Sequence, residues 1–423
     1  MSGPGPVHHH ISSALAGFVA VREAIQKRER LALVAGTPPD GCNLVPGSST
    51  GIRPSSPGNP DLVSGPGNAA VRSMITPAVT TLHAADRLRR QQGWMLDLLG
   101  LGPQQLPARL LLAGRTFRVC TYPAVAADAP PLLLVAAPIK RAYIWDLVPH
   151  ASTVRLLVRA GFTVHLLEWL DPQPSDADLG LEAYADLLLG LAVEAVTQDC
   201  SRAPLLVGHS LGGTLAALFC ARHPHRVRGV VLLESPVHFG VDAGAFAPMV
   251  AASPDLRRVQ PIPGLVPGSL LNLATVMAAP REFLLERYLD LLATLGQPVS
   301  EVHLRVLRWT LDEMALPARL FTEIVEDLYR DDRFMRGQLT IAGRQLGPES
   351  VTVPMSSVID RRSTAIPASS IVPFHHRAAS TRKMLLEYHG DRGVALQHVG
   401  VLVGRRAHNS LWPQLVNWLH AVP

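Results

Sequence analysis

The stretch APLLVGHSLGGTLAALFCAR, residues 203–222, decides the fold class of this chain. Its beginning, Ala203–Ser210, is a short apolar run typical of a buried strand, and Thr214–Arg222 has the composition of a helix. The sequence GHSLGG between them is a glycine-rich turn from strand to helix. Because the two backbones approach closely in such a turn, the positions of Gly208 and Gly212 must lack a Cβ atom. The stretch therefore predicts a tight turn that projects the Ser210 hydroxyl into a cleft.

Further apolar runs on both sides of this turn alternate with helical stretches. Pro131–Ala137, Phe162–Trp169 and Val227–Ser235 are short, continuous and rich in leucine and β-branched residues. Strands separated by helices pair in parallel through right-handed crossovers. The pattern predicts an α/β fold with a mostly parallel, doubly wound sheet that is covered by helices on both faces.

The alternation stops after Pro236 and resumes with the strand-like run Val351–Asp360. The intervening residues contain Pro/Gly breaks and the helical segments Arg281–Leu295 and Val302–Tyr329, so we expect an inserted helical cap at about 237–345. Leu411–Leu419 predicts a closing amphipathic helix.

The amino-terminal region differs in composition from the rest. We expect a helix or tail over residues 1–35, a linker rich in Pro, Gly and Ser over 36–72, and the α/β domain over 73–423.

Composition excludes several classes of protein. Hydrophobic residues make up 48% of the 423 residues and charged residues 17%, which favours a globular protein with a large core. The net charge of +5 is spread along the chain without aromatic interleaving, so no nucleic-acid partner is expected. The four cysteines lie far apart and form no C-x-x-C pair, so we expect free thiols, no metal site and no cofactor.

Targeting signals are not evident either. The amino terminus lacks a basic n-region, and no apolar run reaches the ~18 residues of a membrane span. These features predict a cytoplasmic protein without an integral membrane segment. The mild overall hydrophobicity leaves room for docking on a lipid or polymer surface.

A serine hydroxyl becomes a good nucleophile only when a base takes its proton. His398 follows on a Gly-containing loop before the last helix, and Asp360 ends a strand-like run, so we expect His398 as the base and Asp360 as the carboxylate that orients it. Glu234 and Asp391 are competing carboxylates by position. Other histidines compete with His398. His209 is next to the serine, but a side chain at that place in the turn is expected to point away from it. Four more are candidate bases by residue type alone: His375, His376, His389 and His408.

Two backbone amides are candidates for an oxyanion hole. The N–H of Leu211 starts the helix after the serine, and that of Ile139 lies in the loop after Pro131–Ala137. Lys140 follows in the same loop. It either attracts an anionic substrate or is a solvated surface lysine.

Several segments together resemble the polyhydroxyalkanoate synthases and their α/β-hydrolase relatives. This resemblance covers roughly Trp94 to Leu419 and implies an α/β-hydrolase fold, with Asp360 and His398 at the catalytic positions of the family. Trp309 and Asp312 match its cap segment. The matching segments are APIKRAYIWDL (137–147), GFTVHLLEW (161–169), RWTLDEMALP (308–317), the Asp360 loop and the His398 loop.

One departure from that family bears on the chemistry. The polymerising synthases have a cysteine where this chain has Ser210, and serine forms an oxyester in place of a thioester. An oxyester favours release to water or to one small acceptor. We therefore expect an esterase, thioesterase or acyltransferase acting on a hydroxyalkanoate-like acyl ester or acyl-CoA. A synthase that polymerises hydroxyacyl-CoA and a non-catalytic granule-associated protein are the alternatives, and association as a homodimer stays open.

Overall fold

The computed structural model describes residues 66–122, 126, 128–258, 264–297 and 300–423. The chain divides into two compact units, Met1–Ala78 and Val79–Pro423. Of the first unit only the start of helix α2 (Pro66–Leu98) is described. The expected amino-terminal helix or tail and most of the expected linker lie outside the described residues. Because α2 begins at Pro66, the end of the expected linker is helical.

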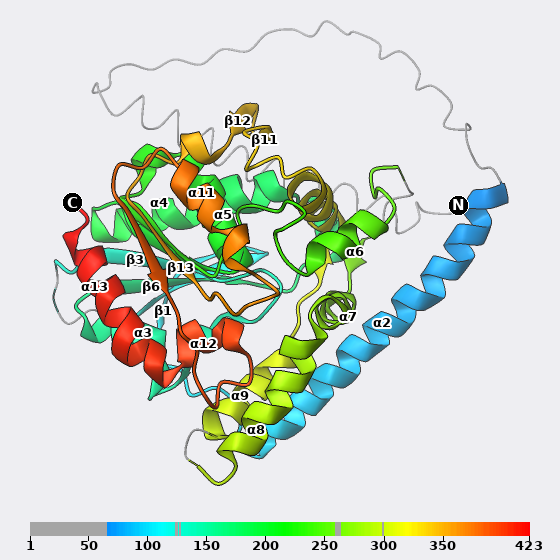
Figure 1. Cartoon of the computed structure of the whole chain (residues 1–423), viewed down its shortest axis with the longest axis horizontal. Helices are drawn as coiled ribbons and strands as arrows, with labels where there is room; N and C mark the ends of the chain where they lie inside the picture. The colour runs from blue at the N-terminus through cyan, green and yellow to red at the C-terminus, as the bar shows by residue number, and fades with distance from the viewer. Residues whose placement is uncertain (1–65, 123–125, 127, 259–263, 298–299) are drawn as a thin grey trace, which may run out of the picture. The chain divides into compact units, whose positions relative to one another are not determined.

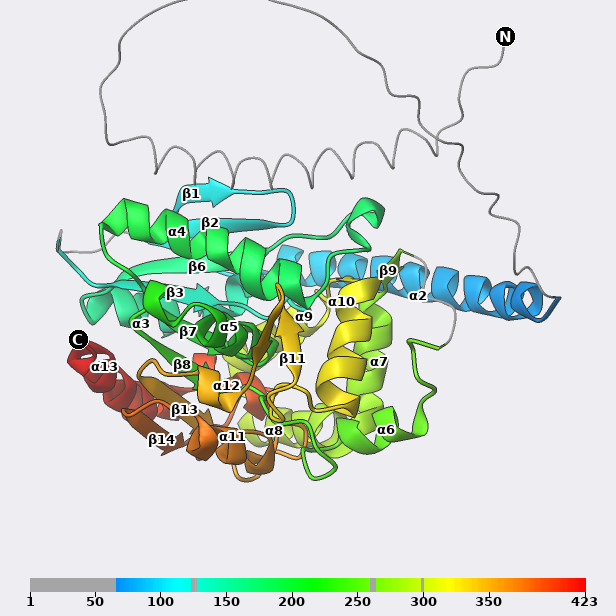
Figure 2. The ribbon, with the colours of Figure 1, turned by 90° about the horizontal axis from the view of Figure 1, so that it is seen from above.

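The second unit is built on one sheet whose strands run in the order β1-β2-β6-β3-β7-β8-β13-β14. Figure 2 shows this succession from β1 at the top to β14 at the bottom. The pairings from β6 to β14 are parallel, and β1 and β2 are joined antiparallel at one edge. The strands are β1 Arg109–Ala113, β2 Phe117–Tyr122, β3 Pro131–Val135, β6 Thr163–Trp169, β7 Leu205–His209, β8 Gly229–Leu233, β13 Met355–Ile359 and β14 Lys383–Glu387.

Helices cover both faces of this sheet, as the alternating sequence predicts. In Figure 1, α4, α5 and α11 lie above the strands, and α3, α12 and α13 lie below them. The central strands β3, β7 and β8 are buried along their whole length because both faces are covered, which explains their continuous apolar sequences. The helices are α3 Thr153–Arg159, α4 Leu189–Cys200, α5 Leu211–Arg222, α11 Val372–Arg377, α12 Gln397–Val403 and α13 Trp412–Ala421.

Between β8 and β13 the chain leaves the sheet and forms an insertion, here called the cap, which is mostly helical. Its helices are α6 Phe246–Ala252, α7 Gly268–Ala278, α8 Glu286–Thr294, α9 Ser300–Thr310 and α10 Ala318–Glu323, with π-helical turns at Arg281–Leu285 and Ile324–Arg330. Short strands β9 (Leu265–Val266), β10 (Leu316–Pro317), β11 (Leu339–Ile341) and β12 (Arg344–Leu346) complete it. Among the described helices, none has both the length and the hydropathy that a membrane span needs.

Candidate active site

The turn after β7 has the conformation that its sequence predicts. Ser210 adopts φ 55° and ψ −133°, a strained backbone for a residue with a side chain, and its N–H donates to the carbonyl of Leu233 at 3.0 Å. A Cβ atom on Gly212 would overlap the carbonyl oxygen of Val135, and one on Gly208 would overlap the backbone of Gly213. The two glycines therefore let α5 start directly behind the strand, with Ser210 partly exposed at the turn.

The imidazole of His398, in the first turn of α12, is brought to this turn through His209. The rings of His209 and His398 lie with their centroids 4.5 Å apart. The Nε2 atom of His209 lies 2.8 Å from the backbone carbonyl of His398, so it is the protonated nitrogen that donates. Burial lowers the pKa of His209 well below its usual value, with the nearby His398 acting in the same direction. A neutral His209 thus anchors the backbone of His398 next to the turn that carries Ser210.

The orienting contact expected of Asp360 is made in this structure by Glu234. The Nδ1 atom of His398 lies 2.9 Å from Oε2 of Glu234. Nδ1–H therefore donates to the carboxylate, which leaves Nε2 as the basic nitrogen. Glu234 follows β8, the strand next to β7, and its backbone has φ 43°.

Asp360 is buried nearby but is occupied by another partner. Its carboxylate accepts hydrogen bonds from the N–H of Arg362 at 2.9 Å and from the guanidinium at 2.8 and 3.1 Å. Asp360 also follows β13, which is two strands away from β7, whereas Glu234 is one strand away. Sheet position and the Arg362 contacts together explain why Glu234, and not Asp360, bonds His398.

The Glu234 carboxylate is buried and incompletely bonded. Within the described part of the chain, its Oε1 atom has no hydrogen-bond partner. Burial raises the pKa of Glu234 to about 7; the hydrogen bond from His398 opposes this rise and the neighbouring Asp360 carboxylate adds to it. This carboxylate is therefore close to the point at which it changes charge at neutral pH.

The hydroxyl of Ser210 makes no hydrogen bond to any other described residue. In related sites the bond from serine to histidine often tightens only when a substrate is present. The expected oxyanion donors both lie in favourable settings. The N–H of Leu211 opens α5, where no helical acceptor precedes it. The carbonyl of Ile139 accepts from Met314 at 3.1 Å, which fixes the loop that carries the Ile139 N–H.

Comparison with known proteins agrees with the fold described above. Residues 141–258 match a family model described as the alpha/beta hydrolase fold. The poly(3-hydroxyalkanoate) polymerase subunit PhaC of Haloferax mediterranei is 27% identical over 293 residues, which cover 68% of this chain and 58% of that protein. The subunit of the same name from Haloarcula marismortui is 24% identical over 362 residues, covering 82% of this chain and 73% of that protein. The chain thus has the α/β-hydrolase fold and is similar to the poly(3-hydroxyalkanoate) polymerase subunits.

A solved structure with a similar chain trace is the monoacylglycerol lipase of Paleococcus ferrophilus, which is 15% identical with a TM-score of 0.46 and covers 73% of this chain and 99% of its own. The strand order and the synthase relatives identify this chain as an enzyme of the α/β-hydrolase superfamily.

Lys140 of this α/β-hydrolase is neither a solvated lysine nor a free cation facing the cleft. Its ammonium bonds to the carboxylate of Glu313 and, at 2.9 Å, to the carbonyl of Thr310, and it lies 5.1 Å from the ring centroid of Trp309. Only 18% of the side chain is exposed. Lys140 therefore ties the loop after β3 to the end of α9, which differs from both expectations for this residue.

Trp309 and Asp312 belong to the same connection. The indole Nε1–H of Trp309 donates to the carbonyl of Arg141 at 2.8 Å. Asp312 accepts from the Tyr143 hydroxyl at 2.8 Å and from Arg308 at 2.6 Å. In this structure the two residues hold the cap on the loop after β3.

The cap is also fastened to the loop that carries His398. Asp290 on α8 accepts from the N–H groups of Gly393 at 2.8 Å and Ala395 at 3.0 Å, and it bonds to His303 at 2.9 Å. A small cavity of about 20 Å³ lies between α8 and His398, enough for about one water molecule. The position of His398 thus depends on the cap as well as on the sheet.

Proposed function

We propose that this protein is a serine-dependent acyl-transfer enzyme that forms a covalent ester on Ser210. The observation that carries the proposal is the strained backbone of Ser210 in a strand-to-helix turn, with His398 anchored beside it and bonded to a buried carboxylate. A strained serine costs on the order of 1–3 kcal/mol, which evolution retains mainly where the conformation is used.

In the proposed mechanism, Nε2 of His398 takes the proton of Ser210 while Oγ attacks the acyl carbonyl carbon. The amides of Leu211 and Ile139 stabilise the negative oxygen of the tetrahedral intermediate. Its collapse breaks the bond to the leaving group, which receives the proton from His398. Water or another acceptor, deprotonated by His398, then attacks the ester and frees Ser210. Glu234 stabilises the positively charged imidazole in both steps. Asp360, the carboxylate expected from the sequence, is the alternative candidate for this role.

The proposed substrates are hydroxyalkanoate-like acyl esters and acyl-CoA thioesters, because the relatives are named poly(3-hydroxyalkanoate) polymerases. The serine nucleophile favours hydrolysis or transfer to a single acceptor. The second candidate is polymerisation itself, which the names of the relatives favour. A cytoplasmic location and contact with a polymer surface or a second copy of the chain remain parts of this proposal.

The test is product analysis with 3-hydroxybutyryl-CoA and a panel of short acyl esters. We expect free hydroxyacid or a single transfer product, and a loss of at least about a thousandfold in kcat for Ser210→Ala. Polymer as the main product would establish the second candidate instead. Ser210→Cys is the matched variant: it restores the nucleophile of the synthases, so a shift toward oligomeric products in this variant would show that the serine limits chain growth.

A further inference from the structure

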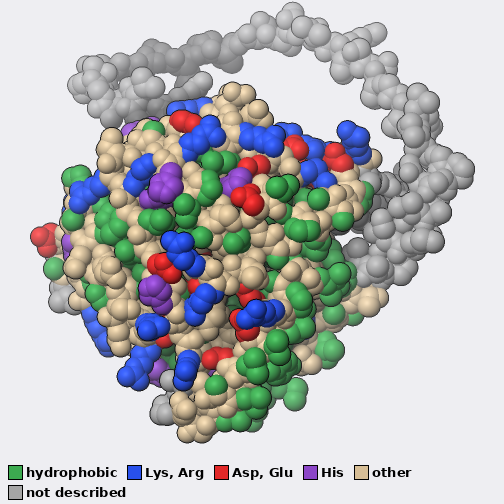
Figure 3. All heavy atoms as spheres, viewed as in Figure 1, with side chains coloured by type: hydrophobic (Ala, Val, Ile, Leu, Met, Phe, Trp, Pro, Cys, Tyr) green, Lys and Arg blue, Asp and Glu red, His purple; other side chains and the backbone are tan. Residues whose placement is uncertain are grey.

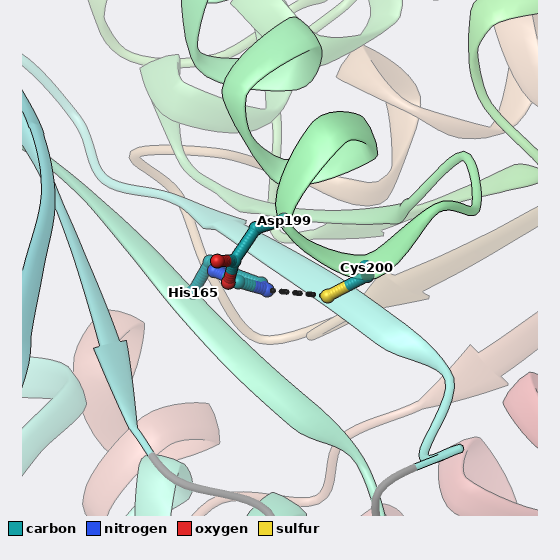
Figure 4. Close-up of side chains that lie close together, drawn as sticks. All are labelled: His165, Asp199 and Cys200. Atoms are coloured by element: carbon teal, nitrogen blue, oxygen red, sulfur yellow. Dashed lines mark hydrogen bonds between the residues drawn. The ribbon is translucent and has the colours of Figure 1, made fainter.

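A second cluster of reactive side chains lies at the sheet edge opposite the Ser210 turn. His165 is near the start of β6, and Asp199 and Cys200 form the last turn of α4. Helix α4 leads into β7, so its end lies where β7 begins, while Ser210 follows the end of β7. Five strand residues span roughly 16 Å. The cluster is therefore separate from the acyl-transfer site. Figure 4 shows the sulfur of Cys200 facing a ring nitrogen of His165, with the carboxylate of Asp199 close to the same ring.

The distances within this cluster suit a metal ion. Nε2 of His165 lies 3.5 Å from Sγ of Cys200, and one ligand atom from each of the three residues lies within 4.8 Å of the others. Tetrahedral zinc with bonds of about 2.0 Å to nitrogen and about 2.3 Å to sulfur separates those two ligand atoms by about 3.5 Å. The histidine and the cysteine thus already have the spacing of two corners of such a site.

Each of two ligands also has an outer partner of the kind that orients metal ligands. Nδ1 of His165 lies 2.9 Å from Oγ1 of Thr121, so the ring is held with Nε2 toward Cys200. The carboxylate of Asp199 accepts from Nη2 of Arg109 at 2.7 and 2.8 Å. Each carboxylate oxygen of Asp199 has a second lone pair, so it can bind a metal ion while it keeps its hydrogen bond to Arg109. The contacts seen in the structure can therefore remain when a metal binds.

We propose that His165, Asp199 and Cys200 bind a divalent cation of the zinc class, with solvent as the fourth ligand. A nitrogen, an oxygen and a sulfur ligand favour zinc over magnesium or calcium, which require oxygen ligands. His165 is buried while Asp199 and Cys200 reach the surface, so the ion enters from solvent. Binding replaces the thiol proton of Cys200, which passes to solvent, and fastens the end of α4 to β6.

The test is titration of the full, chelator-treated chain with Zn²⁺ by calorimetry and with Co²⁺ by absorption. We expect one site with a thiolate-to-cobalt charge-transfer band. Cys200→Ser abolishes the band, and Asp199→Asn weakens binding at least about tenfold. Cys120→Ser is the matched control: Cys120 is also a free thiol, but as the neighbour of Thr121 on β2 it points to the opposite face of the sheet, so this variant keeps the band.

The three consecutive histidines at positions 8–10 are a rival source of metal binding. Replacing all three with alanine leaves the cobalt–thiolate band unchanged if the proposal holds. A second measurement covers the case in which Cys200→Ser fails to fold: Zn²⁺ slows alkylation of Cys200 in the wild-type chain, read by peptide mass spectrometry. A wild-type chain without a cobalt–thiolate band, or alkylation of Cys200 at the same rate with and without Zn²⁺, overturns the proposal.

Discussion

Two carboxylates, Glu234 and Asp360, are candidates to orient His398, and their surroundings assign them different roles. Glu234 bonds the imidazole, whereas Asp360 is bonded by Arg362. Glu234→Gln should therefore lower kcat by about a hundredfold or more, because an amide holds the wrong tautomer and does not stabilise the imidazolium. The matched variant Asp360→Asn should change kcat by less than about tenfold. If steady-state kinetics show a larger loss of kcat for Asp360→Asn than for Glu234→Gln, Asp360 is the residue that orients His398.

Glu234 should also make stability depend on pH. Its pKa rises from an ordinary 4.5 to about 7 through burial. Between these values the folded chain keeps a proton that the unfolded chain has released, so the free energy of unfolding falls as the pH rises through this window. Glu234→Gln should remove that loss and be more stable than the wild type at pH 8, by on the order of 2 kcal/mol. Chemical denaturation at pH 5 and pH 8 measures it. If the free energy of unfolding depends on pH equally in the two proteins, the pKa of Glu234 is not raised by burial.

The sequence predicted the turn that carries Ser210, but it did not predict which carboxylate bonds His398. The glycines around Ser210 identify the turn because no other residue type fits there. Glu234 and Asp360 both end buried strands, and a linear pattern does not tell which of them reaches His398. The choice depends on the order of β7, β8 and β13 and on the contacts of Arg362. His209 was expected to point away from the nucleophile, and its contact with His398 became visible only in three dimensions.

At the scale of elements, α8 holds the loop that presents His398. Asp290→Ala removes the acceptor of two loop amides and of His303. Loss of these bonds should lower stability by on the order of 2 kcal/mol and kcat/KM by about tenfold, because the histidine is less well positioned. Thermal unfolding and ester hydrolysis measure the two effects. Asp255→Asn is the control, since this cap carboxylate bonds Arg257 and not the His398 loop. Unchanged kcat/KM in Asp290→Ala would show that the cap does not position the histidine.

The central elements were predictable because burial on both faces leaves a continuous apolar run. β3, β6, β7, β8 and β13 all fall within the predicted runs, and α13 coincides closely with the predicted closing helix. The edge strands β1 and β14, and the strand β2 next to β1, were not identified. β1 and β14 are partly exposed, so their sequences carry a weaker apolar signal. The helical segment expected over 302–329 is broken between α9 and α10, where Leu316 and Pro317 pair with β9.

At the scale of the whole molecule, the cap exposes an apolar stripe. Leu285, Tyr288, Leu289 and Leu292 follow the i, i+3, i+4, i+7 spacing of one helix face and are 54–66% exposed. Figure 3 shows hydrophobic side chains gathered over this part of the molecule. Large exposed apolar surfaces mark sites of interaction. Because the stripe continues from the helix turn that borders His398, it suits a hydrophobic polyester surface, which would bring acyl chains close to the site.

The double variant Leu285→Lys/Leu289→Lys should weaken binding to polyester particles by at least about tenfold, because each leucine contributes on the order of 1 kcal/mol or more. Its activity on soluble esters should match that of the wild type. Leu110→Lys on β1 is the control, being similarly exposed at 56%. Co-sedimentation measures binding. Equal binding of the wild type and both variants would show that the stripe does not bind polyester. Ultracentrifugation of the same samples would show whether a second copy of the chain covers the stripe.

The most direct test of the acyl-enzyme is to identify which residue becomes acylated. The chain is incubated with a fluorophosphonate probe or a short acyl ester, digested, and analysed by mass spectrometry. We expect a stoichiometric adduct on the peptide that contains Ser210, and no adduct in Ser210→Ala. An unmodified Ser210, or an active enzyme that carries the adduct on another residue, would contradict the nucleophile assigned to this fold.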